Sequence, residues 1–463
     1  MQPTKPRAVD DVLFVCLLLV LTWAPFWLGG NRPIAWMVNI IAFSTLVLTY
    51  EGFRARLPYP VSPALIAGPL ALFAAAAAWV LVQSSTAVPP QFANALWGLA
   101  QDALAAPVAG AISIDPDLTR FSLLTFLPPA AAFWLALQLG RDGRRARSLV
   151  IGVALISGLY AGYALVALQW FPGTLLWFTK VDYVPFATST FVNRNSYATY
   201  AGLGALSCIS ALSGQFAGGS ARTSSVWRRW ATLLLTQGAL IPASLVIALC
   251  LNLIALMLSG SRGGIVCCLL ACAVFFLVSA WRTGFRWLQL ATLAAVGLIT
   301  LFIVSGFDTL VSSRFAAQGL IDQVRWAIAK LSWTALTDRP ISGFGFGTFE
   351  EAFRIYRDAS VVATPRVDKA HNSFIEALLG LGGPAFAMVM SGLVMLVFTC
   401  MKGVRARRKN AEIPILAVAA SVLVASHALV DFSLQIQGVA VTFAMVLGVG
   451  VSQSWPQSAA RPL

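Results

Sequence analysis

The stretch KAHNSFIEALLGLGG, residues 369–383, marks the point where a long polar segment returns to a hydrophobic helix. The segment before it, from Gly306 to His371, is the only long interruption in a chain that is otherwise hydrophobic. It holds 8 of the 32 Lys and Arg residues and one of the two His residues. If the chain carries out chemistry, we expect it in this segment.

The composition of the chain predicts an all-α polytopic membrane protein that forms a single integral membrane domain over residues 1–463. Of the 463 residues, 58% are hydrophobic and 11% are charged, whereas soluble proteins carry about 25% charged residues. A membrane-spanning helix needs roughly 17–25 apolar residues. Twelve stretches fit this length: 12–28, 34–50, 63–83, 121–139, 149–169, 196–212, 231–257, 265–280, 288–306, 384–400, 413–430 and 436–453.

The distribution of basic residues predicts the orientation in the membrane. With twelve spans both termini lie on one side, and the loops on that side hold 19 of the 32 Lys and Arg residues. Basic loops stay in the cytoplasm, so this side is predicted to be cytoplasmic. The net charge of +14 is explained by topology, and nucleic-acid binding is not inferred from it.

The periplasmic face is then built from four pieces. They are an interfacial segment at 84–120, an aromatic segment at 170–195, the turn SGSRGG at 259–264, and a long helical loop at 307–372 between spans nine and ten. The long loop is expected to carry part of an active site.

Asp115 and Asp117 form a D-x-D pattern, which holds a divalent metal in some glycosyltransferases. The simpler interpretation is that Asp117 caps the next helix and Asp115-Pro116 forms the turn before it. We favour the simpler interpretation and predict no metal site and no cofactor.

Two arginines stand close to the predicted periplasmic surface. Arg194 lies just above the sixth span between Asn193 and Asn195, and is either an interfacial anchor or a ligand-binding residue. Arg262 projects from SGSRGG, where glycines let a ligand approach the backbone. A guanidinium there suits a phosphate group, although a contact with lipid headgroups explains it as well.

The stretch 321–337 reads as one amphipathic helix with Arg325 on its apolar side and Lys330 facing water. An unpaired charge on an apolar face is costly, so an anionic partner is expected for Arg325. The predicted apolar strips are Ile321, Val324, Ile328, Leu331 and Ala335 on one side of Arg325, and Trp326, Ala329, Trp333 and Leu336 on the other.

Glycines at 343, 345 and 347 resemble a phosphate loop, but no strand precedes them and no Lys-Ser/Thr pair follows. A tight turn that returns the chain to the membrane is therefore preferred.

The start of the helix after the long loop is predicted at Ser373, which has capping-box spacing with Glu376. Gly380, Gly382 and Gly383 would end it as a short half-helix. His371 lies just before a helix N-terminus, which disfavours an imidazolium, so it is expected to be neutral near pH 7 and able to accept a proton. An interfacial histidine with no chemical role is the alternative.

His427 and Asp431 are four residues apart in the eleventh span, which would place them on one helical face. Ionisable pairs inside a membrane raise the hypothesis of proton-coupled transport. Structural polar packing explains the pair equally well.

Four stretches together resemble the O-antigen ligase and polymerase superfamily of GT-C-type membrane glycosyltransferases. They are STFVNRNSYATYAG (189–202), LSGSRGG (258–264), RWAIAKLSWTALTDRPISGFGFGTFEEAF (325–353) and AHNSFIEALLGLGGPAF (370–386). The resemblance implies metal-independent, inverting transfer of a glycan from an undecaprenyl diphosphate carrier to an acceptor hydroxyl at the periplasmic face of the bacterial inner membrane. It implies His371 as the general base and Arg262, Arg325 and Arg194 as ligands of the diphosphate, supported by Asn372, Glu376 and Asn195.

The family contains polymerases, whose acceptor is another lipid-linked repeat unit, and ligases, whose acceptor is a lipid A core. The stretches FVNRN and VDKAHNSFIE resemble polymerases of exopolysaccharides more closely, and we favour that activity. A flippase or transporter of lipid-linked sugars stays as a further alternative. Such a protein should show inverted repeats, and no internal symmetry is visible in the sequence.

Overall fold

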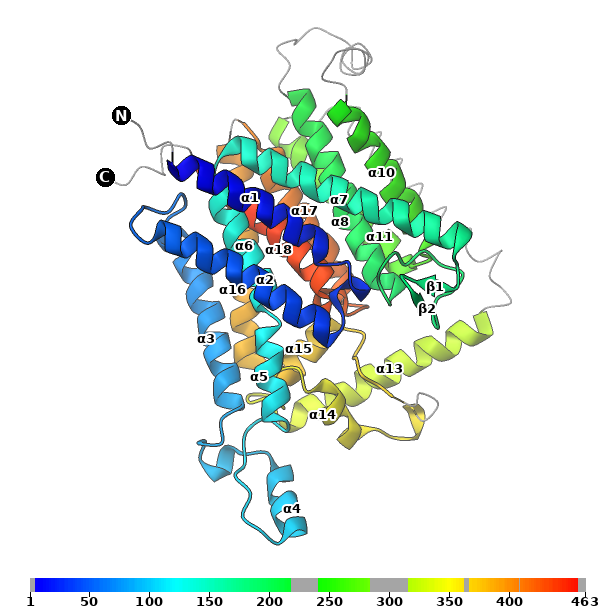
Figure 1. The fold of residues 1–463 in the computed structure, drawn as a ribbon. Helices are drawn as coiled ribbons and strands as arrows, with labels where there is room; N and C mark the ends of the chain where they lie inside the picture. The colour runs from blue at the N-terminus through cyan, green and yellow to red at the C-terminus, as the bar shows by residue number, and fades with distance from the viewer. Residues whose placement is uncertain (1–4, 218–239, 284–314, 362–365, 408, 457–463) are drawn as a thin grey trace.

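The computed structural model describes residues 5–217, 240–283, 315–361, 366–407 and 409–456, and these residues are mostly helical (Figure 1). The bundle consists of α1 (Lys5–Trp23), α2 (Pro33–Arg54), α3 (Ala67–Gln83), α5 (Pro116–Leu124), α6 (Leu127–Leu139), α7 (Gly143–Trp170), α8 (Arg194–Ala217), α10 (Leu240–Leu258), α11 (Arg262–Thr283), α16 (Gly383–Ala406), α17 (Glu412–Ala428) and α18 (Gln437–Ser452). At one end lies an outer layer, which we define as α4 (Ala95–Leu104), α13 (Phe315–Asp338), α14 (Phe349–Tyr356) and α15 (Ser373–Leu381).

Short elements connect these helices. The 3₁₀ turns are η1 (Leu28–Gly30), η2 (Pro63–Ile66), η3 (Pro90–Phe92), η5 (Ala359–Val361) and η6 (Ser433–Gln435). Between α7 and α8, β1 (Thr174–Leu175) and β2 (Phe178–Thr179) form a small antiparallel hairpin.

The prediction of a multi-pass helical membrane protein is confirmed in its coarse form, whereas the count of twelve spans is not. Within the described residues, seven segments are long and apolar enough to cross a bilayer: Pro33–Arg54, Pro63–Gln83, Pro116–Leu139, Gly143–Trp170, Leu240–Leu258, Arg262–Thr283 and Gly383–Ala406. α17 and α18 are shorter apolar helices. α1 and α8 occupy two more of the predicted spans, and the predicted span 288–306 lies outside the described residues.

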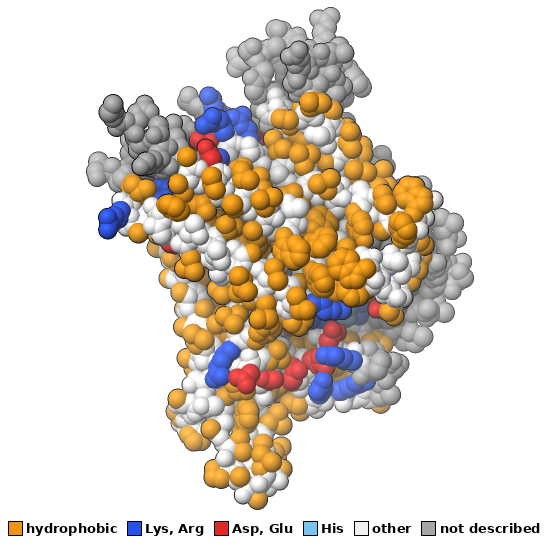
Figure 2. Space-filling model, in the orientation of Figure 1, with side chains coloured by type: hydrophobic (Ala, Val, Ile, Leu, Met, Phe, Trp, Pro, Cys, Tyr) orange, Lys and Arg blue, Asp and Glu red, His pale blue; other side chains and the backbone are white. Residues whose placement is uncertain are grey.

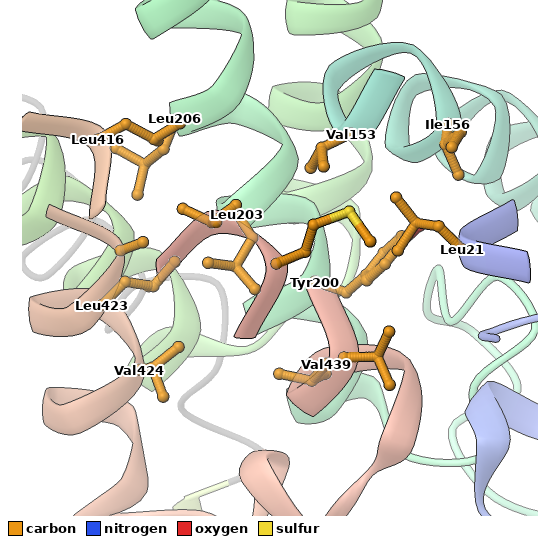
Figure 3. Packing of buried hydrophobic residues seen from close by; sticks show 14 of the residues in the cluster. Leu21, Val153, Ile156, Tyr200, Leu203, Leu206, Leu416, Leu423, Val424 and Val439 are labelled. Atoms are coloured by element: carbon orange, nitrogen blue, oxygen red, sulfur yellow. The ribbon is translucent and has the colours of Figure 1, made fainter. Parts of the chain in front are cut away.

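The main hydrophobic core lies between α1, α7, α8, α17 and α18 (Figure 3). Leu203 and Tyr200 of α8 pack there against Leu423 of α17 and Val439 of α18. Small residues let the helices approach closely, as is common inside membranes. At Gly158 of α7, a β-carbon would lie 2.6 Å from the β-carbon of Ala248 in α10. α17 and α18 are apolar on all sides, which fits their central position.

The end of the bundle where α1 and α7 begin, here called the basic end, is closed by charged pairs. Asp10 binds Arg54 at 2.7 Å and Arg145 at 3.2 Å. Arg141 donates to the carbonyl of Ser452, which ends α18. A broad hydrophobic surface separates this end from the charged residues near the outer layer (Figure 2).

The outer layer has its own core, in which Ile328 and Ala335 of α13 pack with Phe349 and Phe353 of α14. α15 and α16 are consecutive, and Gly382, with φ 78°, separates them as the sequence predicts. The hairpin that carries α4 extends beyond the ends of α3 and α5 (Figure 1), and its Leu99 and Leu104 are exposed.

Candidate active site

His371 stands immediately before α15 in a backbone conformation with φ 50°. The predicted capping box is wrong, because Asn372 is the N-cap and its Oδ1 accepts from the amides of Phe374 and Ile375. Ser373 instead donates its hydroxyl to the carbonyl of Asp431. An Asn at this position satisfies the first amides of the helix as well as a Ser does. The half-helix is therefore held from Asp431, in the segment between α17 and η6, as well as by its own cap.

Glu376 fixes the chain on the other side of His371. It is buried, and its carboxylate accepts from the amide of Ala370 at 3.1 Å and from Nζ of Lys369 at 3.3 Å. These bonds hold the residue that precedes His371, while Asn372 holds the residues that follow it. The unusual backbone of His371 is thus held on both sides.

The imidazole of His371 packs edge-on against Phe432, with ring centroids 5.3 Å apart. Its Nδ1 is buried and has no hydrogen-bond partner among the described residues. Burial lowers the pKa of His371 below its ordinary value of 6.5, and the charge of Arg325 lowers it further, against the opposing charges of Asp431, Asp368 and Glu376. The expected neutral imidazole is supported, with burial as the main cause.

Arg325 is half-buried on α13, whereas Lys330 of the same helix is exposed, as predicted. The helix begins at Phe315, earlier than the predicted residue 321. The second predicted apolar strip is wrong in part, because Trp326 and Trp333 are 78% and 59% exposed. At 100° per residue these tryptophans share the outward face with Lys330. A Trp-Lys face is typical of a helix at a membrane surface.

Arg194 begins α8, and its guanidinium lies over two aromatic rings. The guanidinium carbon is 4.2 Å from the centroid of Phe186 and 5.3 Å from that of Tyr183. Asn193 accepts from the amide of Asn195, and Asn195 reaches Asp431 with Nδ2 at 3.5 Å. The predicted supporting residue Asn195 therefore links α8 to the segment after α17.

The predicted turn 259–264 is shorter in the structure, since α10 ends at Leu258 and α11 begins at Arg262. Gly260 has φ 62°, and a β-carbon there would collide with the Phe186 ring and lie 3.3 Å from Nη1 of Arg194. Arg262 is exposed in the first turn of α11. The Arg194 guanidinium and this turn are therefore neighbours.

The predicted residues come together at the end of the bundle that carries the outer layer. Burial raises the pKa of Tyr183, and the positive charges of Arg194 and Arg325 both oppose that rise. Arg325 also acts on His371. A β-carbon at Gly263, next to Arg262, would lie 3.5 Å from Nε2 of His427. One basic region thus contains residues from α8, α11 and α13 and lies near the start of α15.

His427 and Asp431 belong to a buried polar network, which agrees with the alternative of structural polar packing, although its partners Thr199 and Ser433 were not predicted. α17 ends at Ala428, so the two residues do not share a helical face as predicted. His427 Nδ1 is 2.6 Å from Thr199 Oγ1 and 3.2 Å from Ser433 Oγ, and Ser433 donates to Asp431. Thr199 and Ser433 were missed because hydroxyl residues in apolar segments carry no distinct pattern.

Among the residues that the structure describes, no group of three or more His, Cys, Asp or Glu side chains is arranged to hold a metal ion. Asp115, and not Asp117 as predicted, caps α5 by accepting from the amide of Leu118. Asp117 forms an exposed ion pair with Arg120 at 3.0 Å. Both aspartates of the D-x-D pattern thus have local structural partners.

The predicted glycine turn packs onto the end of the half-helix. The amides of Phe344 and Gly345 donate to the carbonyls of Leu379 and Gly380, which close α15. Glycines 343, 345 and 347 all have positive φ. Contacts this close between two backbones leave no space for side chains. The turn therefore fastens α15 to α14 and α13.

Residues 245–390 match the O-antigen ligase family model. The resemblance to the O-antigen ligase and polymerase superfamily is thereby confirmed. The match begins in α10, ends in α16, and contains Arg262, Arg325 and His371, whereas Arg194 lies before it. No curated protein matches the chain. The helical architecture and this family match together point to a multi-pass bacterial membrane protein that is similar, over residues 245–390, to O-antigen ligases.

Proposed function

We propose that the protein transfers a glycan from undecaprenyl diphosphate to a sugar hydroxyl at the periplasmic face of the inner membrane. In this proposal twelve spans place both termini in the cytoplasm, and the segments 84–120 and 307–372 lie in the periplasm. The observation that carries the proposal is the buried His371, whose Nδ1 has no hydrogen-bond partner among the described residues and whose pKa is lowered by burial and by the charge of Arg325.

The chemistry follows from the residue types. The oxygen of the acceptor hydroxyl attacks the anomeric carbon, and His371 takes the proton of that hydroxyl as general base. The bond from the anomeric carbon to the phosphate oxygen breaks, and undecaprenyl diphosphate leaves with the electron pair. Attack from the side opposite the leaving group inverts the anomeric configuration.

The leaving group needs stabilisation of charge, which preorganised cations supply. We assign this task to Arg325 and Arg262, with Arg194 as a third ligand. Asn372 and Glu376 position His371 through the backbone on either side of it, and Asn195 supports the site through Asp431. The reaction as proposed requires no metal and no cofactor, and belongs to the GT-C type.

Polymerisation of lipid-linked repeat units is our first candidate, from the FVNRN and VDKAHNSFIE stretches. Ligation to a lipid A core is the second candidate, and the description of the matching family as O-antigen ligase favours it. The transporter alternative rested on His427 and Asp431. His427 lies within hydrogen-bond distance of Thr199 and Ser433, and Asp431 accepts from Ser433. The family match supports transfer over transport.

The central experiment measures transfer by the purified protein from a lipid-linked donor, in excess EDTA, with either a second lipid-linked unit or lipid A core as acceptor. Arg325→Ala and Arg262→Ala should raise the KM for the donor and lower turnover, because each removes a charge-assisted contact to the diphosphate. Lys at either position should restore little, since a point charge lacks the bidentate fork of Arg.

Activity that is lost in EDTA and restored by magnesium or manganese would contradict the metal-independent mechanism. The topology is tested separately, with reporters fused near Lys409 and Asp358. The first should be cytoplasmic and the second periplasmic. The reverse result would place the arginines and His371 on the wrong side for the donor.

A further inference from the structure

Lys180 is a buried lysine in the segment between α7 and α8, directly after β2. Its residue is only 9% exposed, and its Nζ donates to the carbonyl of Phe186 at 2.7 Å. Lys180 and Phe186 line the same small cavity, together with Thr188 and Ser189. Burial lowers the pKa of Lys180 to about 8. A lysine is seldom buried in this way unless its position has a use.

The residue that Lys180 binds supports two parts of the candidate active site. The ring of Phe186 lies under the guanidinium of Arg194 at 4.2 Å. The same ring fills the space beside Gly260, where a side chain larger than hydrogen would collide with it. Next along the chain, the amide of Ala187 donates to the carbonyl of Leu258 at the end of α10. Phe186 therefore sits between Arg194 and the turn that leads to Arg262.

The ammonium of Lys180 donates to the backbone carbonyl of Phe186, so its described link to Arg194 and to the turn runs through that residue. A hydrogen bond from a charged donor is about twice as strong as a neutral one. The bond thus restrains the backbone of Phe186, and the ring carries that restraint to the guanidinium. A cation is attracted to the face of an aromatic ring, so the ring position affects where the guanidinium rests.

We propose that Lys180 is a positioning residue for donor binding, which holds Phe186 and through it sets Arg194 and the Gly260 turn against the diphosphate. This inference rests on the proposed role of Arg194 as a diphosphate ligand. It adds a residue that contacts neither the donor nor the acceptor. It also assigns a task to the aromatic segment between α7 and α8, which lies outside the matched region of residues 245–390.

The test measures binding of undecaprenyl diphosphate, without a glycan, to the purified full-length protein. Lys180→Met keeps the length of the side chain and removes the N–H donor. The Kd should rise about tenfold, as for the loss of one charge-assisted contact between Arg194 and the diphosphate, and no further than in Arg194→Ala. Lys180→Gln keeps an N–H donor and should recover part of that loss. Lys330→Met removes an exposed lysine outside the site and serves as the matched control, with an unchanged Kd.

The double variant Lys180→Met/Arg194→Ala decides whether Lys180 acts through Arg194. Binding by the double variant should be no weaker than binding by Arg194→Ala alone, because without the Arg194 guanidinium the position of Phe186 no longer affects it. Fully additive losses would overturn the inference and leave the diphosphate site intact. An unchanged Kd for Lys180→Met would overturn it as well. Normal binding by Arg194→Ala, with weak binding by Arg325→Ala, would instead remove Arg194 from the proposed site.

A second variant keeps the test informative if Lys180→Met does not fold. Phe186→Leu leaves the carbonyl that Lys180 binds and removes the ring under Arg194, so it should weaken binding in the same non-additive way with Arg194→Ala. Transfer at saturating donor should fall no further in the Lys180 variants than in Arg194→Ala, because Lys180 acts only through that arginine. A fall in kcat with an unchanged Kd would contradict the positioning role.

Discussion

The charges of Arg325 and Asp431 act on both histidines of the chain, yet the surroundings of the two imidazole rings differ. His427 is 1% exposed, and its Nδ1 lies within hydrogen-bond distance of Thr199 and Ser433. His371 keeps an Nδ1 with no partner among the described residues, on a backbone held at φ 50°. A histidine whose bonds are satisfied internally is suited to hold a structure. One with an unsatisfied nitrogen beside a cationic region is suited to meet a ligand.

The largest expected effect is on transfer, and it follows from replacing His371, whose Nδ1 has no partner among the described residues. His371→Ala should lower kcat by about 10²–10⁴-fold, the usual contribution of a general base. The affinity for undecaprenyl diphosphate should stay near that of the unchanged protein, since the base acts on the acceptor. Near-normal transfer by His371→Ala would contradict its assignment as the base.

Replacing His427, whose Nδ1 lies within hydrogen-bond distance of Thr199 and Ser433, should mainly lower the stability of the protein. His427→Ala leaves the hydroxyls of Thr199 and Ser433 buried without their ring partner, which costs about 1–3 kcal/mol. The midpoint of thermal unfolding in detergent should fall clearly, and transfer by the folded fraction should fall much less than in His371→Ala. Unchanged stability of His427→Ala together with a complete loss of transfer would contradict the structural role assigned to His427.

The pH dependence of kcat, measured at saturating donor, tests whether His371 is the group that titrates. Because the pKa of His371 is lowered from its ordinary value of 6.5, the base is still neutral at pH values just under 6.5. Activity should be lost only as the pH falls through the lowered pKa. In Arg325→Ala one cause of the lowering is removed, so the acid limb should move to higher pH. A limb that does not move in Arg325→Ala would show that His371 is not the titrating group.

The smallest effect is expected at Lys330. Lys330→Ala removes an exposed side chain that shares the outward face of α13 with Trp326 and Trp333. Surface substitutions of this kind change stability by less than about 0.5 kcal/mol. Transfer measured beside Arg325→Ala should stay close to normal, and a loss as large as that of Arg325→Ala would invalidate the difference between the two faces.

The sequence predicted features that depend on local pattern. Most helices of the bundle begin and end near the predicted spans, and the break at Gly382 follows from three glycines in four residues. The buried and exposed positions of Arg325 and Lys330 follow from helical periodicity. The helix cap at Asn372 was missed because Ser373 offers an equally good local pattern, and only the structure distinguishes them.

Features that depend on distant contacts were not predictable. Lys180 is an ordinary lysine in the sequence, and its use appears only when its bond to Phe186 is placed under Arg194. The network of His427 joins residues from α8, α17 and η6 that no spacing rule connects. One signal was available for Lys180, since it is the only basic residue of an aromatic stretch over residues 170–193.

The glycine turn between α13 and α14 has a consequence for how the sequence is free to vary. A β-carbon at Gly345 would collide with Ser113, and one at Gly347 with Ser122. The positive φ of both glycines fixes their identity, so the freedom to adjust lies with the serines alone. Any enlargement of Ser113 or Ser122 pushes against the turn that closes α15. Ser113, just before α5, and Ser122, in its last turn, are therefore expected to stay small in evolution, although they lie more than 200 residues from His371 in the sequence.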